Sequence, residues 1–338
     1  MEHERRSTLQ KITGRLKLIE PLVYRRRVPL GAFRYFEHAG PEEAGAVAPD
    51  VDDSLWPVVE PGTYWGQWNA SFTLRSRFRV PQDWDDAGPV GVVLNLGEIH
   101  NWDFCHPEAL VYVDGRAVAG CDKYHRLIVL PADCCDGEEH VLALHGYTGR
   151  WGCFEDPPAA RLLMERCDIV QVDAATQALI ATVCVALGAA EVLDDNQPAK
   201  GRILNALDEA FKVLDTREPL GEPFYESVPE ARAVLEAGLR RAGPSLDVDV
   251  TAVGHSHIDV AWLWPLAQTR RKCGRSFHTV LALMEEFERY RFTQSQPQLY
   301  DYVRQDYPEL FERIKELSLI HISEPTRPLY ISYAVFCL

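Results

Sequence analysis

Hydrophobic and polar residues alternate along much of the chain between residues 31 and 160, the pattern of half-buried β-strands. The alternation is clearest in WNASFTLRSRFRVP (68–81), and VGVVLNLGEI (90–99) is an almost continuous apolar run. Residues 109–120 are predicted to form two short strands around Asp114-Gly115, a pair that favours a tight hairpin turn. With further strands expected at 125–131 and 139–148, the spacing predicts a β-sandwich.

From residue 161 the apolar positions recur at helical spacing. We expect helices within residues 169–193, 200–215 and 228–243, and a short helix within residues 1–30. At residues 245–254 the apolar residues again alternate at every second position, which predicts a strand. Helices are expected at 275–290 and 307–316, separated by a short strand near YRFTQSQ. Strand, helix, strand, helix is how an α/β domain begins.

These patterns predict a multidomain α+β protein. Its expected parts are an N-terminal helical lead-in (1–30), a β-sandwich domain (31–160), a helical linker region (161–243), the start of an α/β domain (244–316) and a tail (317–338). The tail has only Glu324 and Arg327 as acid and base, and it ends in an apolar run. We expect it to be read-through from a sequencing adapter, with the α/β domain truncated soon after it begins; a natural edge strand is the alternative.

Charge and cysteine usage narrow the class of protein. The formal net charge of −15 disfavours nucleic acid and anionic membrane surfaces as partners. No run approaches 18 apolar residues and the N-terminus, MEHERRSTLQ, has no apolar signal segment, so we expect no membrane association. The nine cysteines show no CxxC spacing, which disfavours a zinc ribbon and indicates reduced thiols in a cytoplasmic protein.

The segment VGHSHIDVAWLWP (253–265) places His255, His257 and Asp259 at alternate positions in an apolar context, where polar groups without partners are costly. In an extended segment these side chains line one side, with Cα atoms about 6–7 Å apart. Imidazole nitrogen and carboxylate oxygen suit a divalent ion such as zinc, and the site would lie at the carboxyl end of a strand over 247–253. The alternative is a pair of hydrogen-bonded core histidines, with Asp259 capping the next helix.

The octapeptide HSHIDVAW (255–262) resembles the first metal-site motif of the glycoside hydrolase family 38 α-mannosidases, His-Ser-His-x-Asp-x-x-Trp. GHSHIDVAWLWP is similar to the cytosolic, bacterial-type branch of that family. The resemblance continues in TRRKCGRSFHTVLALMEEF and FTQSQPQLYDYV and covers residues from about 20 to 316. It implies that the β-sandwich is jelly-roll-like and that residues 244–316 are the first strands and helices of a truncated (β/α) barrel glycosidase domain.

The resemblance also implies roles for the motif residues. His257 and Asp259 would bind a catalytic divalent metal, Zn²⁺ or alternatively Co²⁺, Trp262 would form an aromatic wall for the sugar, and His255 would orient the ligands. The family mechanism retains configuration and uses two carboxyl groups, one of them an Asp nucleophile that also binds the metal. That Asp and a further His lie well downstream in the family. No catalytic residue is therefore assigned in this chain, which we expect to be inactive.

Other polar residues after the motif are interpreted as structural. Asp301 and Asp306 are expected on a solvated helix face, and His278 and His321 are not convincing replacement ligands.

Charged and aromatic residues elsewhere are also interpreted as structural. Residues 270–272, Arg-Arg-Lys, are expected as exposed charges at the start of a helix. In the β-rich region, His100, Trp102 and His106 are expected to pack at an interdomain surface rather than to form a second sugar site.

The expected function is that of an N-terminal fragment of a retaining, metal-dependent α-mannosidase. Its substrates would be terminal α-mannosides in mannose-containing oligosaccharides in the cytoplasm, and a homo-oligomer of the full-length protein is compatible with the sequence. One alternative is a metal-dependent amidohydrolase, which also carries His-x-His at the end of a first barrel strand. Another is a non-catalytic carbohydrate-binding module built on residues 31–160.

Overall fold

The computed structural model describes residues 2–40, 45–84, 88–97, 106–149, 162–218, 221–243, 248, 250–262 and 264–321. It is a mixed α/β structure with several sheets. Contacts between Cα atoms divide the chain into two compact units: unit 1 comprises Met1–Val28, Asp83–Gly91 and Val170–Val250, and unit 2 comprises Pro29–Gln82, Val92–Ile169 and Thr251–Leu338. The domain limits expected from the sequence stay predictions.

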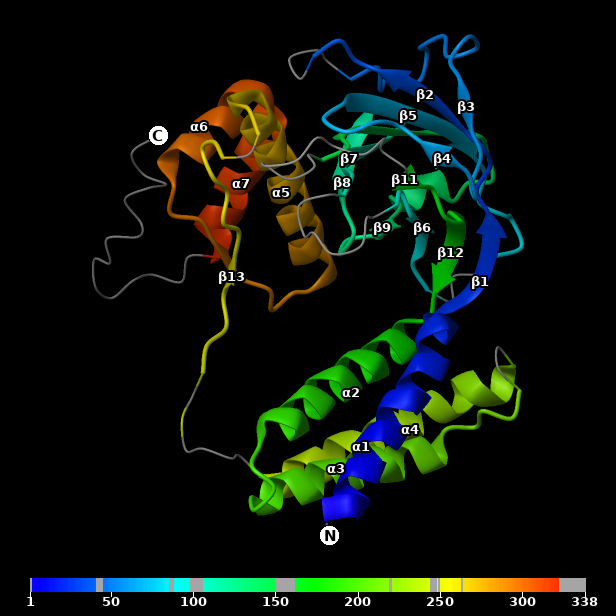
Figure 1. Ribbon diagram of the computed structural model, residues 1–338, viewed down its shortest axis with the longest axis vertical. Coiled ribbons are helices and arrows are strands. Elements are labelled where there is room, and N and C mark those ends of the chain that lie inside the picture. The colour runs from blue at the N-terminus through cyan, green and yellow to red at the C-terminus, as the bar shows by residue number, and fades with distance from the viewer. Residues whose placement is uncertain are drawn as a thin grey trace. The chain divides into compact units, whose positions relative to one another are not determined.

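Unit 1 contains a cluster of helices (Figure 1). They are α1 (Glu2–Ile19), continued by the 3₁₀ helix η1 (Glu20–Val23), α2 (Ala174–Val192), α3 (Pro198–Val213) and α4 (Glu222–Ala242). Apolar residues from all of them form one core. The four expected helices are confirmed. The fourth begins at Glu222 rather than at 228, because a proline in its first turn starts it and Pro229 lies inside the helix.

Helix α2 begins at Asp173, whose side chain accepts a hydrogen bond from the backbone N–H of Thr176 at 2.7 Å. It is 19 residues long with a mean hydropathy of 1.6, enough by length and composition to cross a membrane. Glu191 is the sole charged residue of α2, although polar residues such as Thr176 interrupt its apolar run. The expectation of no membrane association stays a prediction. Core helices of water-soluble proteins meet the same criterion, and Leu179 and Val183 of α2 are buried in the helical core.

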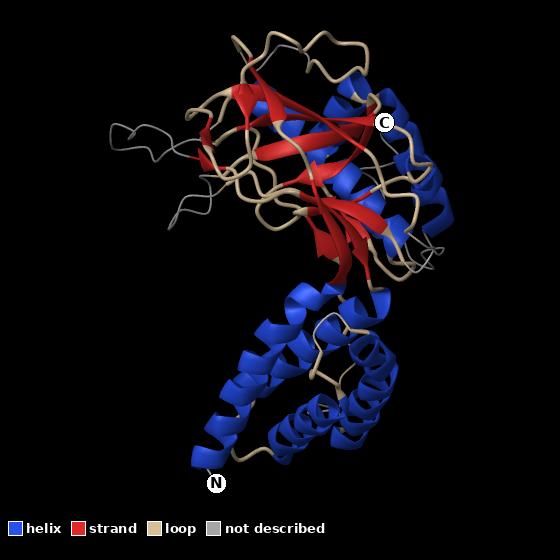
Figure 2. Ribbon diagram, turned by 90° about the vertical axis from the view of Figure 1, so that its right-hand side faces the viewer, coloured by secondary structure: helices blue, strands red, loops and turns tan. Residues whose placement is uncertain are grey.

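The β-rich region forms two larger sheets (Figure 2). One has the order β3-β2-β5-β10-β7-β8 and its neighbouring strands are antiparallel. Its strands are β2 (Phe33–Glu37), β3 (Val58–Val59), β5 (Ser71–Phe78), β7 (Glu108–Val113), β8 (Arg116–Cys121) and β10 (His140–Tyr147). The other has the order β1-β12-β6-β9, from β1 (Tyr24–Pro29), β6 (Val90–Val93), β9 (Leu127–Val129) and β12 (Asp168–Val172). Short strands β4 (Tyr64–Trp65) and β11 (Leu162–Leu163) also pair.

The expected strands are found in these sheets, and the predicted hairpin is confirmed. Strands β7 and β8 are joined by Asp114 and Gly115, whose φ angles of 49° and 80° match a tight turn that needs positive φ. The apolar run at 90–99 is a strand only in β6; residues 94–97 have no regular structure and 98–99 lie outside the described residues.

Strand β5 is buried along nearly its whole length, including one arginine. Arg75 is 1% exposed, and its Nε donates to Asp53 Oδ2 at 2.8 Å while Nη1 donates to the carbonyls of Ala46 and Ala48. A buried guanidinium is tolerated because these partners replace water. It therefore ties the segment before β3 to the sheet.

The last part of unit 2 is an α/β segment. Strand β13 (Gly254–His255) pairs in parallel with β14 (Phe292–Thr293), and α5 (Leu266–Glu286) connects them; α6 (Pro297–Asp306) and α7 (Pro308–His321) follow. A helical crossover between parallel strands is the arrangement expected of an α/β domain. Buried residues of this segment, among them Ile258, Phe277 and Leu299, form their own core.

Three boundaries in this segment differ from the sequence prediction. The expected strand at 245–254 is much shorter: residues 250–253 have no regular structure, and 244–247 and 249 lie outside the described residues. Helix α5 begins at Leu266 rather than 275, so that Gly274 lies inside it. A Cβ at Gly274 would stand 2.4 Å from the Tyr307 ring, which explains why a glycine fits there. Helix α7 continues to His321, and the tail beyond it lies outside the described residues.

Candidate functional site

The motif segment leaves strand β13 after His255. It is held by side chains that donate hydrogen bonds to its backbone carbonyls and by one buried side chain of its own. Gln294 Nε2 donates to the carbonyl of Ser256 at 2.6 Å, and the Ile258 side chain, 1% exposed, packs in the core of the α/β segment. Thr269 Oγ1, in the first turn of α5, donates to the carbonyl of Asp259 at 3.0 Å. The loop is therefore fixed at both ends and in its middle.

The side chains of His257 and Asp259 face each other. The distance from His257 Nε2 to Asp259 Oδ1 is 3.1 Å, and these side chains are 79% and 39% exposed. Two ligand atoms about 2.0–2.1 Å from one tetrahedral zinc ion would stand about 3.3 Å apart. The pair therefore fits two donors to one ion, by both spacing and atom type.

The alternative of hydrogen-bonded core histidines does not match this geometry. His255 and His257 are both exposed. Helix α5 begins after Pro265 and has no side-chain cap, so Asp259 does not cap it.

His255 lies in a different environment from the pair. It lines a pocket of about 270 Å³ whose ionisable lining residues include Glu108, Asp122, His125, Lys272 and Arg275. Neither His257 nor Asp259 lines that pocket, and no hydrogen bond in the described part of the chain joins His255 to either. Strand alternation does not place the three side chains together, because the strand ends at His255. An orienting role for His255 stays a prediction.

Two tryptophans follow the pair in the sequence. The Trp262 side chain is 50% exposed, and its ring meets that of Trp264 edge to face with centroids 5.6 Å apart. Trp264 Nε1 donates to Thr269 Oγ1 at 2.9 Å, and Lys272 Nζ lies 5.4 Å from the centre of the Trp264 ring. Trp264 is therefore anchored to α5, whereas Trp262 is half exposed.

A complete metal site is not assembled from the part of the chain that the structure describes. No group of three or more His, Cys, Asp or Glu side chains there could hold an ion. His278 Nδ1 donates to the carbonyl of Gly274 at 2.8 Å, and burial lowers the pKa of this ring. Asp301 pairs with Arg304 at 2.5 Å. The backbone of His321 ends α7, and its side chain lies outside the described residues.

The charges at 270–272 are not the exposed helix-start charges expected from the sequence. Arg270 Nε donates to Asp306 on α6 at 2.7 Å, and Lys272 Nζ donates to both carboxylate oxygens of Glu108 on β7 at 2.6 and 2.8 Å. The side chains of Arg270 and Lys272 are only 27% and 25% exposed. Arg271 contacts His145 on β10. The prediction is wrong because α5 lies on the sheet, which no local pattern indicates.

Glu108 was missed by sequence reasoning. Burial by itself would raise the pKa of its carboxyl, but the charges of Arg275 and Lys272 outweigh burial and lower the pKa from 4.5 to about 2. Arg275 Nη2 donates to it at 2.7 Å. His106, also buried, has its Nε2 3.8 Å from Glu108 Oε1, whereas His100 and Trp102 lie outside the described residues. A lone glutamate at the start of a strand gives no sequence signal that it will pair with two basic residues of a distant helix.

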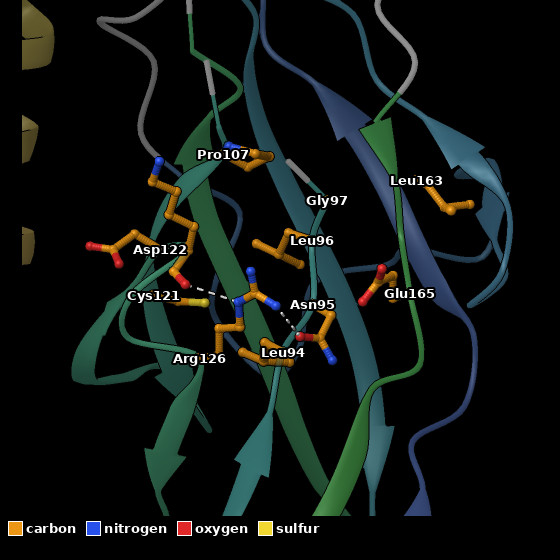
Figure 3. Close-up of a pocket in the computed structure, with 11 residues that line it drawn as sticks. Leu94, Asn95, Leu96, Gly97, Pro107, Cys121, Asp122, Arg126, Leu163 and Glu165 are labelled. Carbon is orange, nitrogen blue, oxygen red and sulfur yellow. Dashed lines mark hydrogen bonds between the residues drawn. The ribbon is translucent and has the colours of Figure 1, made fainter. Parts of the chain in front are cut away.

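A second pocket, of about 140 Å³, is separate from the motif (Figure 3). Arg126 spans part of it, donating from Nη1 to Asn95 Oδ1 at 3.2 Å and from Nε to the carbonyl of Lys123 at 2.9 Å. No described motif residue lines this pocket.

Known proteins resemble this chain in the motif region and beyond it. The profile of the family described as glycosyl hydrolases family 38 N-terminal domain matches residues 247–325. Human alpha-mannosidase 2C1 is 28% identical over 279 residues, which are 79% of this chain and 24% of that protein. An alpha-mannosidase of Saccharomyces cerevisiae is 28% identical over 267 residues, 73% of this chain and 23% of that protein.

A shorter match with higher identity is to alpha-mannosidase G of Dictyostelium discoideum. It is 52% identical over 67 residues, which are 20% of this chain and 6% of that protein. The chain thus spans about a quarter of the length of the human and yeast relatives. Among solved structures, a β-glucuronidase from Ruminococcus gnavus matches 44% of this chain and 29% of that chain at 10% identity and a TM-score of 0.31, too low to carry an argument.

Proposed function

We propose that this chain is the N-terminal part of an α-mannosidase-like glycoside hydrolase, because the profile of the family 38 N-terminal domain matches residues 247–325. Its substrate class would be terminal α-mannosides in mannose-containing oligosaccharides, as the names of the human and yeast relatives suggest. The observation that carries the proposal is the 3.1 Å approach of His257 Nε2 to Asp259 Oδ1 inside the matched segment. A cytoplasmic location is part of the proposal.

His257 and Asp259 would hold a divalent cation, with Zn²⁺ ahead of Co²⁺. When bound, the ion would supply Lewis-acid contacts to sugar hydroxyls. The chain's own contribution is to present two donor atoms side by side on a loop whose backbone is fixed at Asp259 by Thr269. Trp262 would offer its half-exposed ring to the apolar face of a sugar.

The rest of the reaction would need groups beyond this pair. Retaining glycosidases use two carboxyl groups about 5–5.5 Å apart, and a closed zinc site needs four ligands. We expect those groups in the parts of the relatives that this chain does not span, and no turnover by the chain alone. The parallel β13-α5-β14 unit supports the start of a (β/α) barrel, and a jelly-roll arrangement of residues 31–160 is proposed with it.

Metal binding tests the proposal directly. Wild-type protein, His257→Ala and Asp259→Ala would be titrated with Zn²⁺ and Co²⁺ by calorimetry. Wild type is expected to bind one ion at this loop, and each variant to bind it at least about tenfold more weakly, because one of only two protein donors is lost.

The matched control is His125→Ala. His125 Nδ1 lies 3.0 Å from Asp122 Oδ1, so it belongs to a histidine–aspartate pair of similar spacing outside the motif. Its replacement should leave the affinity unchanged. Equal affinity in wild type and His257→Ala, or no binding by wild type, would refute the proposed metal site.

A further inference from the structure

Helix α5 lies against the six-stranded sheet (Figure 1). One polar side chain per helical turn contacts the sheet. The positions are Gln268, Arg271, Arg275 and Thr279, which share one helix face because they are three or four residues apart. They contact β5, β10, β7 and β8, and this is the order of those strands in the sheet. The helix therefore crosses four neighbouring strands and makes one of these side-chain contacts with each strand.

The first two contacts are made by the N-terminal half of α5. Gln268 Nε2 donates to Ser71 Oγ at 3.1 Å, and Arg271 Nη1 contacts His145 Nε2. His145 Nδ1 donates to the carbonyl of Phe72 at 3.1 Å. Burial, with the charge of Arg271 next, lowers the pKa of His145 to about 3, so the ring is neutral and its Nε2 can accept from the guanidinium.

The strongest contact is made in the middle of the helix. The Glu108 carboxylate accepts two hydrogen bonds from Lys272 and one from Arg275, between 2.6 and 2.8 Å, and its side chain is 22% exposed. Charge-assisted bonds of this kind are about twice as strong as neutral ones. Farther along, Thr279 Oγ1 accepts from the backbone N–H of Gly120 at 3.0 Å. Glu108 is thus the ionic centre of the contact between helix and sheet.

The same helix holds the motif loop. Thr269, three residues before Lys272, donates from Oγ1 to the carbonyl of Asp259 and accepts from Trp264 Nε1. Lys272 also lies over the Trp264 ring. A single helical turn therefore connects the Glu108 ion pair with the backbone of Asp259.

We propose that Glu108 is a positioning residue for the His257–Asp259 pair. Through Lys272 and Arg275 it sets where α5 lies on the sheet, and Thr269 on α5 then sets where the Asp259 backbone lies. The β-rich part of the chain would thereby support the metal site without supplying a ligand. The inference rests on the proposed function, in which this pair binds a divalent cation.

The test is the Co²⁺ affinity and absorption spectrum of Glu108→Gln, which keeps the shape of the side chain and removes its charge. We expect affinity to fall about tenfold, as for other residues that support metal ligands, and the spectrum of the bound ion to change. If Glu108 only stabilised the fold, its replacement would lower the unfolding temperature. The Co²⁺ affinity and the absorption spectrum of the folded protein would then stay unchanged.

Matched variants complete the design. Glu285→Gln, which removes a carboxylate paired with Arg313 at the other end of α5, should bind as wild type. Lys272→Met should weaken Co²⁺ binding as Glu108→Gln does. Lys272→Arg should bind Co²⁺ as the wild type does, because it keeps the charge.

Thr269→Val removes the hydroxyl that holds Asp259 and should weaken binding even if Glu108→Gln fails to fold. If Thr269→Val, or a folded Glu108→Gln, bound Co²⁺ with wild-type affinity, this inference would be overturned. The proposed function would stand. Absence of Co²⁺ binding by wild type would overturn the proposed function, and this inference with it.

Discussion

Replacing Glu108 with glutamine should destabilise unit 2 at neutral pH and make its stability less sensitive to acid. The charges of Arg275 and Lys272 overcome the effect of burial and lower the pKa of Glu108 from 4.5 to about 2. At about 1.4 kcal/mol per pH unit, that difference corresponds to roughly 3 kcal/mol of stability. Because the side chain is only 22% exposed, solvent screening should remove a minor part of it.

The sign follows from the depressed pKa in the folded state. The unfolded chain binds the proton first as pH falls, so the stabilisation is complete above pH 4.5 and is lost as pH falls from about 4.5 to about 2. Stability of the wild type should therefore exceed that of Glu108→Gln by about 3 kcal/mol at pH 7, with the gap closing through this interval.

Urea denaturation between pH 3 and 7, followed by tryptophan fluorescence, would measure this gap. Of the eight tryptophans only Trp84 belongs to unit 1, so the signal reports mainly on unit 2. Glu285→Gln is the control: its ion pair with Arg313 is exposed and should contribute less than about 1 kcal/mol. A gap that is the same at pH 3 and pH 7, or below about 1 kcal/mol at pH 7, would refute the reasoning.

Two other sets of variants test the packing of each unit by the same urea method. In unit 1, Gly238→Ala should cost about 1–3 kcal/mol, because the new Cβ would stand 2.4 Å from Ala206 Cβ, whereas Gly188→Ala, with open space around it, should stabilise α2 by up to about 1 kcal/mol. Equal effects of the two would contradict the close approach of α3 and α4. In unit 2, Arg75→Met should cost about 3 kcal/mol or more, because Asp53 loses its buried partner; a neutral effect would show that the buried ion pair is not formed.

Local patterns were sufficient for most of the elements. Helical periodicity predicted α2 and α3 to within a few residues, and Asp114-Gly115 predicted the hairpin, because both signals depend on neighbouring residues. The start of α5 differs from the expected residue 275, and the helix includes Gly274, where the absence of a side chain lets the Tyr307 ring pack against it. Such a contact between α5 and the residue before α7 depends on tertiary structure.

The candidate site was predictable only in its sequence-local part. His257 and Asp259 are two residues apart, and their spacing alone suggested that they meet. The support for them was not predictable: Glu108 is 164 residues from Lys272, and nothing in either segment indicates the other. Sequence reasoning also grouped His255 with the pair, because it extended the strand beyond the residue at which β13 ends.

Anomalous scattering from crystals soaked in Zn²⁺ tests most directly whether His257 and Asp259 share one cation. The expected result is a single peak about 2.0–2.2 Å from both His257 Nε2 and an Asp259 carboxylate oxygen, absent in the double alanine variant. A peak elsewhere, or no peak between these two side chains in crystals where the loop is open to solvent, would contradict the proposed metal site.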